Sequence, residues 1–142
     1  MRVASRPTDR LETMSLSKSG PASSPLVVGA AVADVVLILV FAAIGRDAHA
    51  RDGIFTGVFL TAWPFLAGAA AGWLATRAWR DPMSLRRAGA GVWLGSLIGG
   101  MLLRALTGQT VVVAFVVVAL LSLGVLLMGY RALYRIIRRR RS

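Results

Sequence analysis

Four long apolar runs, separated by short charged segments, limit what this chain can fold into. They cover residues 26–45, 54–76, 88–103 and 110–130, and Asp34 is the only charged residue inside them. A helix of about 20 residues rises about 30 Å, the thickness of the hydrocarbon core of a bilayer. We therefore expect an all-α membrane protein. Because the connections are short, we expect its four transmembrane helices to form an antiparallel, up-down-up-down bundle.

The distribution of basic residues predicts the orientation of this bundle. Segments 1–25, 77–87 and 131–142, on one side, contain fourteen Arg and Lys residues, whereas segments 46–53 and 104–109 contain three. Cytoplasmic segments of membrane proteins are enriched in Arg and Lys. The pattern predicts a multi-pass protein of the bacterial inner membrane with both termini in the cytoplasm. It also accounts for the net charge of +11 without a nucleic-acid partner.

Both ends of the chain are predicted to lie outside the membrane domain. Residues 1–25 are rich in Ser and Pro, which predicts a disordered cytoplasmic tail, and Met14 is an alternative start. Residues 131–142 are predicted to continue the last helix as a basic cytoplasmic tail, whose Arg cluster we expect to bind anionic lipid headgroups. Ala48-His49-Ala50 resembles a signal-peptidase site, but the apolar run before it is longer than that of a usual signal peptide.

Asp34 is the clearest candidate for a residue with a chemical role. Counted from the start of its run, it lies near the middle of the bilayer, where an acidic side chain costs roughly 2.5–3.5 kcal/mol. One interpretation is a proton or cation site in which Asp34 is neutral at rest. The other is a protonated carboxyl that hydrogen-bonds to a neighbouring helix and fixes its register. Hydroxyl groups at comparable depth predict a polar layer around it: Thr61, Ser96 and Ser122.

A second group of polar residues is predicted at the outer ends of the helices. Arg46, Asp47 and His49 follow the first run, and Arg104 ends the third. Exposed ion pairs in such a hairpin cap contribute under about 1 kcal/mol. His49, the only histidine, would titrate near physiological pH if unperturbed, so a pH-responsive outer gate is the alternative.

Glycines at a spacing of four residues predict close helix packing. Small residues at this spacing let two helix backbones approach each other within a membrane. The interpretation is packing inside the bundle, or a seam with a second copy or another membrane subunit. The glycines are Gly68 and Gly72 in the second run, and Gly91, Gly95 and Gly99 in the third.

The sequence contains no recognisable catalytic or cofactor motif. It has no Cys and one His, which excludes disulfides and makes a metal site within one chain improbable. There is no P-loop, G-x-S-x-G, H-E-x-x-H or dinucleotide fingerprint. We expect neither an enzyme nor a cofactor, and an enzyme acting on lipid headgroups is the least favoured hypothesis because no nucleophile–base pair is visible.

Several local features also occur together in a known family. They are Asp34, FAAIGRDAH (41–49), Pro64-Phe65, GMLLRALTGQ (100–109) and Phe115. Their order resembles a family of small actinobacterial and haloarchaeal membrane proteins, defined as a domain of unknown function (3054), over roughly residues 27–133. The resemblance implies a compact multi-helix membrane protein and transfers no activity, ligand or catalytic residue.

Two functional hypotheses follow from these features. The first is an accessory or structural membrane subunit that packs through its Gly-rich helix faces with itself or with another subunit. The alternative is a small proton- or cation-linked transporter or channel that uses Asp34 and is gated by the outer polar layer.

Overall fold

The computed structural model describes residues 23–46 and 53–142. The predicted disordered tail therefore lies almost entirely outside the described residues, as do Asp47 and His49 of the predicted outer layer. The side chain of Arg46 also lies outside them.

Four long helices make up most of the described chain. Their bounds are α2 (Ser24–Arg46), α3 (Ile54–Thr76), α4 (Ala90–Leu106) and α5 (Val113–Arg141), with the short helices η1 (Ala78–Arg80) and η2 (Leu85–Gly89) between α3 and α4. Each long segment is long and apolar enough to cross a membrane. The predicted all-α chain with four apolar helices is confirmed.

Several predicted ends of the apolar runs differ from the helical segments by one to three residues. The third apolar segment begins at Leu85 and not at residue 88, because η2 is a π-helix that continues directly into α4. Its first turn is capped by Ser84, whose side-chain oxygen accepts from the backbone N–H of Arg87 at 3.1 Å. The fourth helix continues to Arg141, which confirms the prediction that the basic tail prolongs the last helix.

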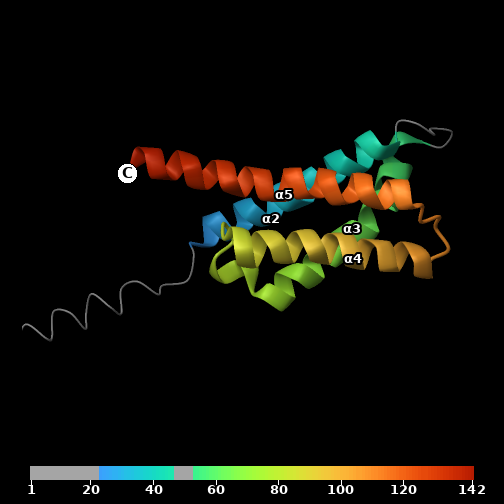
Figure 1. The fold of residues 1–142 in the computed structure, drawn as a ribbon, viewed down its shortest axis with the longest axis horizontal. Coiled ribbons are helices and arrows are strands. Elements are labelled where there is room, and N and C mark those ends of the chain that lie inside the picture. The colour runs from blue at the N-terminus through green and yellow to red at the C-terminus, as the bar shows by residue number, and fades with distance from the viewer. Residues whose placement is uncertain (1–22, 47–52) are drawn as a thin grey trace, which may run out of the picture.

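The helices pack side by side around one apolar core. Helices α2 and α4 each contact both α3 and α5. The α3–α4 connection and the C-terminus lie at one end of the bundle, and the α4–α5 connection lies at the other (Figure 1). The C-terminal part of α5 projects beyond the rest of the bundle (Figure 1).

Three phenylalanine rings fill part of the core. Phe41 and Phe65 meet edge to face with ring centroids 5.3 Å apart, and Phe115 lies 6.3 Å from the first and 6.2 Å from the second. These separations are within the range in which aromatic rings attract one another. The rings therefore join α2, α3 and α5 through apolar contacts.

The predicted glycine stripes face each other across α3 and α4. A Cβ atom on Gly72 would lie 2.5 Å from the carbonyl oxygen of Gly91, and one on Gly95 would lie 2.8 Å from that of Gly68. A Cβ atom on Gly99 would meet the Cα of Gly68 at 2.8 Å. Real Cβ atoms do not approach backbone this closely, so only glycine permits this packing. The sequence left open whether the stripes pack inside the bundle or form a seam with another chain. In the structure, they pack against each other within one chain.

Candidate functional site

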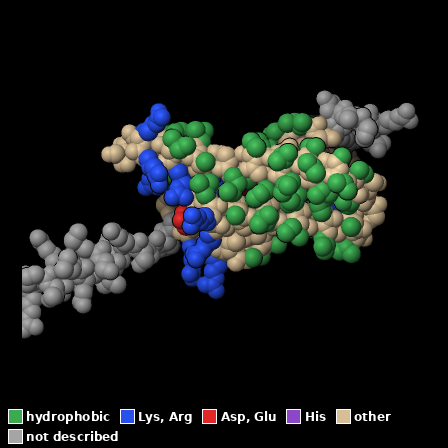
Figure 2. All heavy atoms as spheres, viewed as in Figure 1, with side chains coloured by type: hydrophobic (Ala, Val, Ile, Leu, Met, Phe, Trp, Pro, Cys, Tyr) green, Lys and Arg blue, Asp and Glu red, His purple; other side chains and the backbone are tan. Residues whose placement is uncertain are grey.

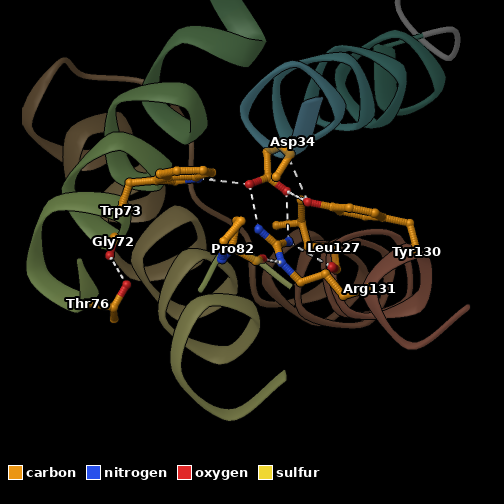
Figure 3. A network of polar contacts seen from close by, with 9 residues as sticks. Asp34, Gly72, Trp73, Thr76, Pro82, Leu127, Tyr130 and Arg131 are labelled. Carbon is orange, nitrogen blue, oxygen red and sulfur yellow. Dashed lines mark hydrogen bonds and ion pairs between the residues drawn. The ribbon is translucent and has the colours of Figure 1, made fainter. Parts of the chain in front are cut away.

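Asp34 in α2 and Arg131 in α5 form a buried, two-pronged ion pair (Figure 3). Nη1 of Arg131 donates to Oδ1 of Asp34 at 2.8 Å, and Nη2 donates to Oδ2 at 2.7 Å. Asp34 is 2% exposed and Arg131 is 0% exposed. The planar guanidinium matches both carboxylate oxygens at once, which is the strongest geometry for such a pair.

Two aromatic side chains complete the hydrogen bonding of the carboxylate. Nε1 of Trp73, in α3, donates to Oδ2 at 2.8 Å, and the hydroxyl of Tyr130 donates to Oδ1 at 2.7 Å. Each oxygen of Asp34 thus accepts two hydrogen bonds. An ionised carboxylate accepts hydrogen bonds and donates none, so this arrangement suits a charged Asp34, whereas the sequence predicted a neutral one.

Arg131 also ties the pair to the connection between α3 and α4. Its Nε donates to the carbonyl oxygen of Pro82 at 2.9 Å, and its Nη1 donates to that of Leu127 at 2.9 Å. Within the described residues, no nitrogen of Arg131 is buried without a hydrogen-bond partner. One guanidinium group therefore links α2, α5 and the α3–α4 connection.

These contacts place the ion pair level with the C-terminal end of α3. Trp73 lies in the last turn of α3, and Pro82 lies in the connection that follows. Along α2, Asp34 lies ten residues from Ser24 and twelve from Arg46, which is the middle of this candidate span. Its depth near the midplane of a bilayer stays a prediction.

The three partners of Asp34 are not evident from the sequence. The sequence pattern places Arg131 in the headgroup-binding tail and does not connect Trp73 or Tyr130 with Asp34. One signal was present, since a charged residue within a span usually needs a partner of opposite charge. Arg131 lies ten residues from the end of α5, and Asp34 lies ten residues from the start of α2. This equal spacing would have indicated Arg131 as the partner, but it can be counted only once the end of α5 is known.

The three predicted hydroxyl groups are not among the hydrogen-bond partners of Asp34. Ser96 is buried in α4 and donates to the carbonyl oxygen of Phe65 at 3.0 Å. Thr61 is half-buried in α3. Ser122 borders a crevice of about 390 Å³ between α2 and α5. The predicted polar layer around Asp34 is therefore replaced by Trp73 and the Tyr130-Arg131 pair.

Arg104 is the only member of the predicted outer layer whose side chain is described. Its guanidinium carbon lies 4.7 Å from the centre of the Phe115 ring, and its Nη2 donates to the carbonyl oxygen of Thr110 at 3.2 Å. A cation over an aromatic face is attracted by the ring. Arg104 therefore fastens the α4–α5 connection, and its predicted contacts with the first loop lie outside the described residues.

An apolar crevice runs beside the ion pair. It lies between α2 and α3, has a volume of about 450 Å³, and is bordered by Asp34, Ile38, Leu66 and Trp73. The polar side chains that border it, Asp34 and Trp73, are already hydrogen-bonded to each other. Within residues 23–46 and 53–142, no three His, Asp or Glu side chains are placed to hold a metal ion.

Four apolar helices closed by a buried ion pair define the class: a helical bundle with four candidate membrane spans. Residues 31–134 match the family described as "Protein of unknown function (DUF3054)", and the chain belongs to this family. The predicted resemblance is thereby confirmed, and both members of the ion pair lie inside the matched segment. No curated protein and no solved structure matches this chain.

Proposed function

We propose that the chain spans the bacterial cell membrane four times with both termini in the cytoplasm. Lys and Arg side chains gather at the end of the bundle where α5 ends, while apolar side chains cover much of the remaining face (Figure 2). Accumulation of basic residues at one end supports this orientation. Because the chain has no Cys, single cysteines at Thr107 and Ser142 provide a clean test. An impermeant maleimide added to intact spheroplasts should label the first and not the second.

Within the membrane, the proposed role is that of an accessory or structural subunit without catalytic action. The observation that carries this proposal is the complete hydrogen bonding between the carboxylate of Asp34 and the side chains around it. A transport site must exchange its partners for an ion or for water. Here the carboxylate accepts four hydrogen bonds from fixed donors, so the pair acts as a clamp between helices.

A partner of this subunit would contact a lipid-facing surface and not the glycine stripes. Those stripes are already covered, because Gly72 faces Gly91 and Gly68 faces Gly95. The hypothesis of an accessory subunit is therefore kept, but with apolar side chains in place of the glycines as the contact surface. The exposed side chains open to a partner include Phe59, Ile98 and Val125.

Purification at native expression level tests the structural role. The tagged chain, solubilised in mild detergent, should be recovered either as an oligomer of fixed size or in a constant molar ratio with one other membrane protein. Light scattering gives the mass of the assembly, and in-cell cross-linking at Ile98 identifies the neighbour. A monomer without cross-links would contradict the proposal.

The alternative, a proton- or cation-linked transporter, is favoured by one observation. Asp34 borders the crevice between α2 and α3, so its carboxylate lies next to a space that opens on the bundle surface. Proteoliposomes with an internal pH dye or potassium indicator test this alternative. Flux that disappears in Asp34→Asn and persists in Ser122→Ala would support transport, whereas flux equal to that of empty liposomes supports the structural role.

A further inference from the structure

A polar cleft lies between the projecting part of α5 and the α3–α4 connection. It has a volume of about 350 Å³. Its α5 wall carries three arginines and a tyrosine, and its other wall belongs to the connection. The residues that line it are Asp81, Met83, Tyr134, Arg135, Arg138, Arg139 and Ser142.

The cleft has an excess of positive charge. Arg135, Arg138 and Arg139 lie three and four residues apart on α5, so they share one helix face. Asp81 is the only acidic side chain among the lining residues, and the described part of the chain forms no ion pair between it and these arginines. Like charges on one helix face repel one another unless an anion lies between them.

We propose that this cleft binds the phosphodiester of an anionic glycerophospholipid whose headgroup carries hydroxyl groups. Guanidinium groups match phosphate oxygens with paired N–H donors. The hydroxyl of Tyr134, which accepts from Nη1 of Arg138 at 3.4 Å, keeps its own proton to donate to the same phosphate. Asp81 supplies an acceptor for a headgroup hydroxyl and repels a headgroup carboxylate.

The position of the cleft matches the phosphate level of a bilayer. It lies beyond the apolar part of α5, at the end where the basic side chains gather (Figure 2). Trp79, in η1 of the same connection, is 41% exposed, and Tyr134 lines the cleft itself. Trp and Tyr are enriched at the membrane–water interface, where they lie level with the headgroups.

The cleft is also joined to the buried ion pair. Asp81 directly precedes Pro82, whose carbonyl oxygen accepts from Nε of Arg131. Arg135 lies one helical turn beyond Arg131 on α5. A lipid held in the cleft therefore contacts the same connection that the ion pair holds in place, and it reinforces this end of the bundle.

Titration of the full chain in detergent micelles tests the proposal. Native mass spectrometry measures the affinity for phosphatidylglycerol and phosphatidylethanol, which both carry one net negative charge on a phosphodiester. The wild-type chain should prefer phosphatidylglycerol, because only its headgroup presents hydroxyl groups to Asp81. Asp81→Ala should remove most of this preference, and equal affinities in the wild type would overturn the assignment of Asp81.

A charge-matched pair of triple variants separates a built site from general surface charge. Arg135→Gln/Arg138→Gln/Arg139→Gln should weaken phosphatidylglycerol binding by at least about 10-fold, because loss of even one direct hydrogen bond from a guanidinium group to the phosphate costs about a factor of ten. The control removes three exposed arginines that do not line the cleft, Arg80→Gln/Arg140→Gln/Arg141→Gln, and should change the affinity less than about threefold. Equal weakening in both variants would overturn the proposal.

Two further measurements complete the test. Circular dichroism and thermal unfolding check that both triple variants keep the fold, which we expect because all six side chains are exposed. Competition with glycerol 3-phosphate distinguishes the sources of the phosphate. Displacement of the lipid by millimolar glycerol 3-phosphate would assign the site to a soluble phosphate ester, and resistance would assign it to the lipid. A wild-type chain that binds neither compound contradicts the proposal.

Discussion

The guanidinium of Arg131 donates hydrogen bonds to both oxygens of the Asp34 carboxylate, although the two residues are 97 positions apart in the sequence. This contact joins the first described helix to the last and closes the bundle. Closing so long a loop costs conformational entropy, which the contact offsets only after the helices between them have packed. The ion pair therefore reports on the assembled bundle as a whole.

Removing one member of this pair should strongly destabilise the bundle. Arg131→Met leaves a buried carboxylate without its cation, and Asp34→Leu leaves a buried guanidinium without its anion. Each should lower the free energy of unfolding by about 3–5 kcal/mol. Reversible unfolding in detergent micelles, followed by circular dichroism, measures the change.

The double variant Asp34→Leu/Arg131→Met is the control for this prediction. It removes both charges, so its loss of stability should be smaller than the sum of the two single losses. Additive losses would mean that the two side chains act independently and that the clamp is not a pair.

The hydroxyl of Tyr130 should matter much more than that of Tyr134. Tyr130→Phe removes a 2.7 Å hydrogen bond to the Asp34 carboxylate, which should cost about 1.5–3 kcal/mol because the acceptor is charged. Tyr134→Phe removes only a 3.4 Å contact with Arg138 at the exposed end of α5. Thermal unfolding in the absence of added lipid compares the two variants, and equal effects would count against the network.

A methyl group between α3 and α4 should not be tolerated. Gly72→Ala places a Cβ atom 2.5 Å from the carbonyl oxygen of Gly91, so the helices must separate, at a cost of about 1–3 kcal/mol. The matched control is Gly129→Ala, because a Cβ atom there has nothing within 4 Å. It should be neutral or stabilise α5 by about 0.5–1 kcal/mol. Similar unfolding temperatures for both variants would contradict the close packing of α3 and α4.

Phe115 should contribute more to stability than an exposed phenylalanine of the same size. Phe115→Leu removes ring contacts with Phe41 and Phe65 and the cation contact with Arg104. Each aromatic or cation contact is worth about 0.5–1.5 kcal/mol beyond the buried area, so a loss of about 1–3 kcal/mol is expected. Phe55→Leu, at a position that is 82% exposed, is the control and should change the unfolding free energy by less than about 0.5 kcal/mol.

The four apolar helices could be predicted from the sequence because hydropathy and length are local properties. The bounds of α3 agree with the second predicted run, and the family match was expected. The glycine spacing likewise predicted a close contact, although not which of its two interpretations applies. The boundary error at Leu85 arose where a helix continues through polar residues, which hydropathy alone does not reveal. The continuation of the last helix into the basic tail was predicted and is confirmed.

By itself, the sequence determined that four apolar segments form helices and that Asp34, a charge within one of them, needs a partner. Only the tertiary structure decided that the partner is Arg131 and that Trp73 and Tyr130 complete its hydrogen bonding. The physical reason is that backbone hydrogen bonds and side-chain hydropathy act within one helix, whereas the depth and rotation of one helix against another follow from packing. That packing set Asp34 against the end of α3 and its connection to α4, and it placed one arginine of the predicted tail at the centre of a buried clamp.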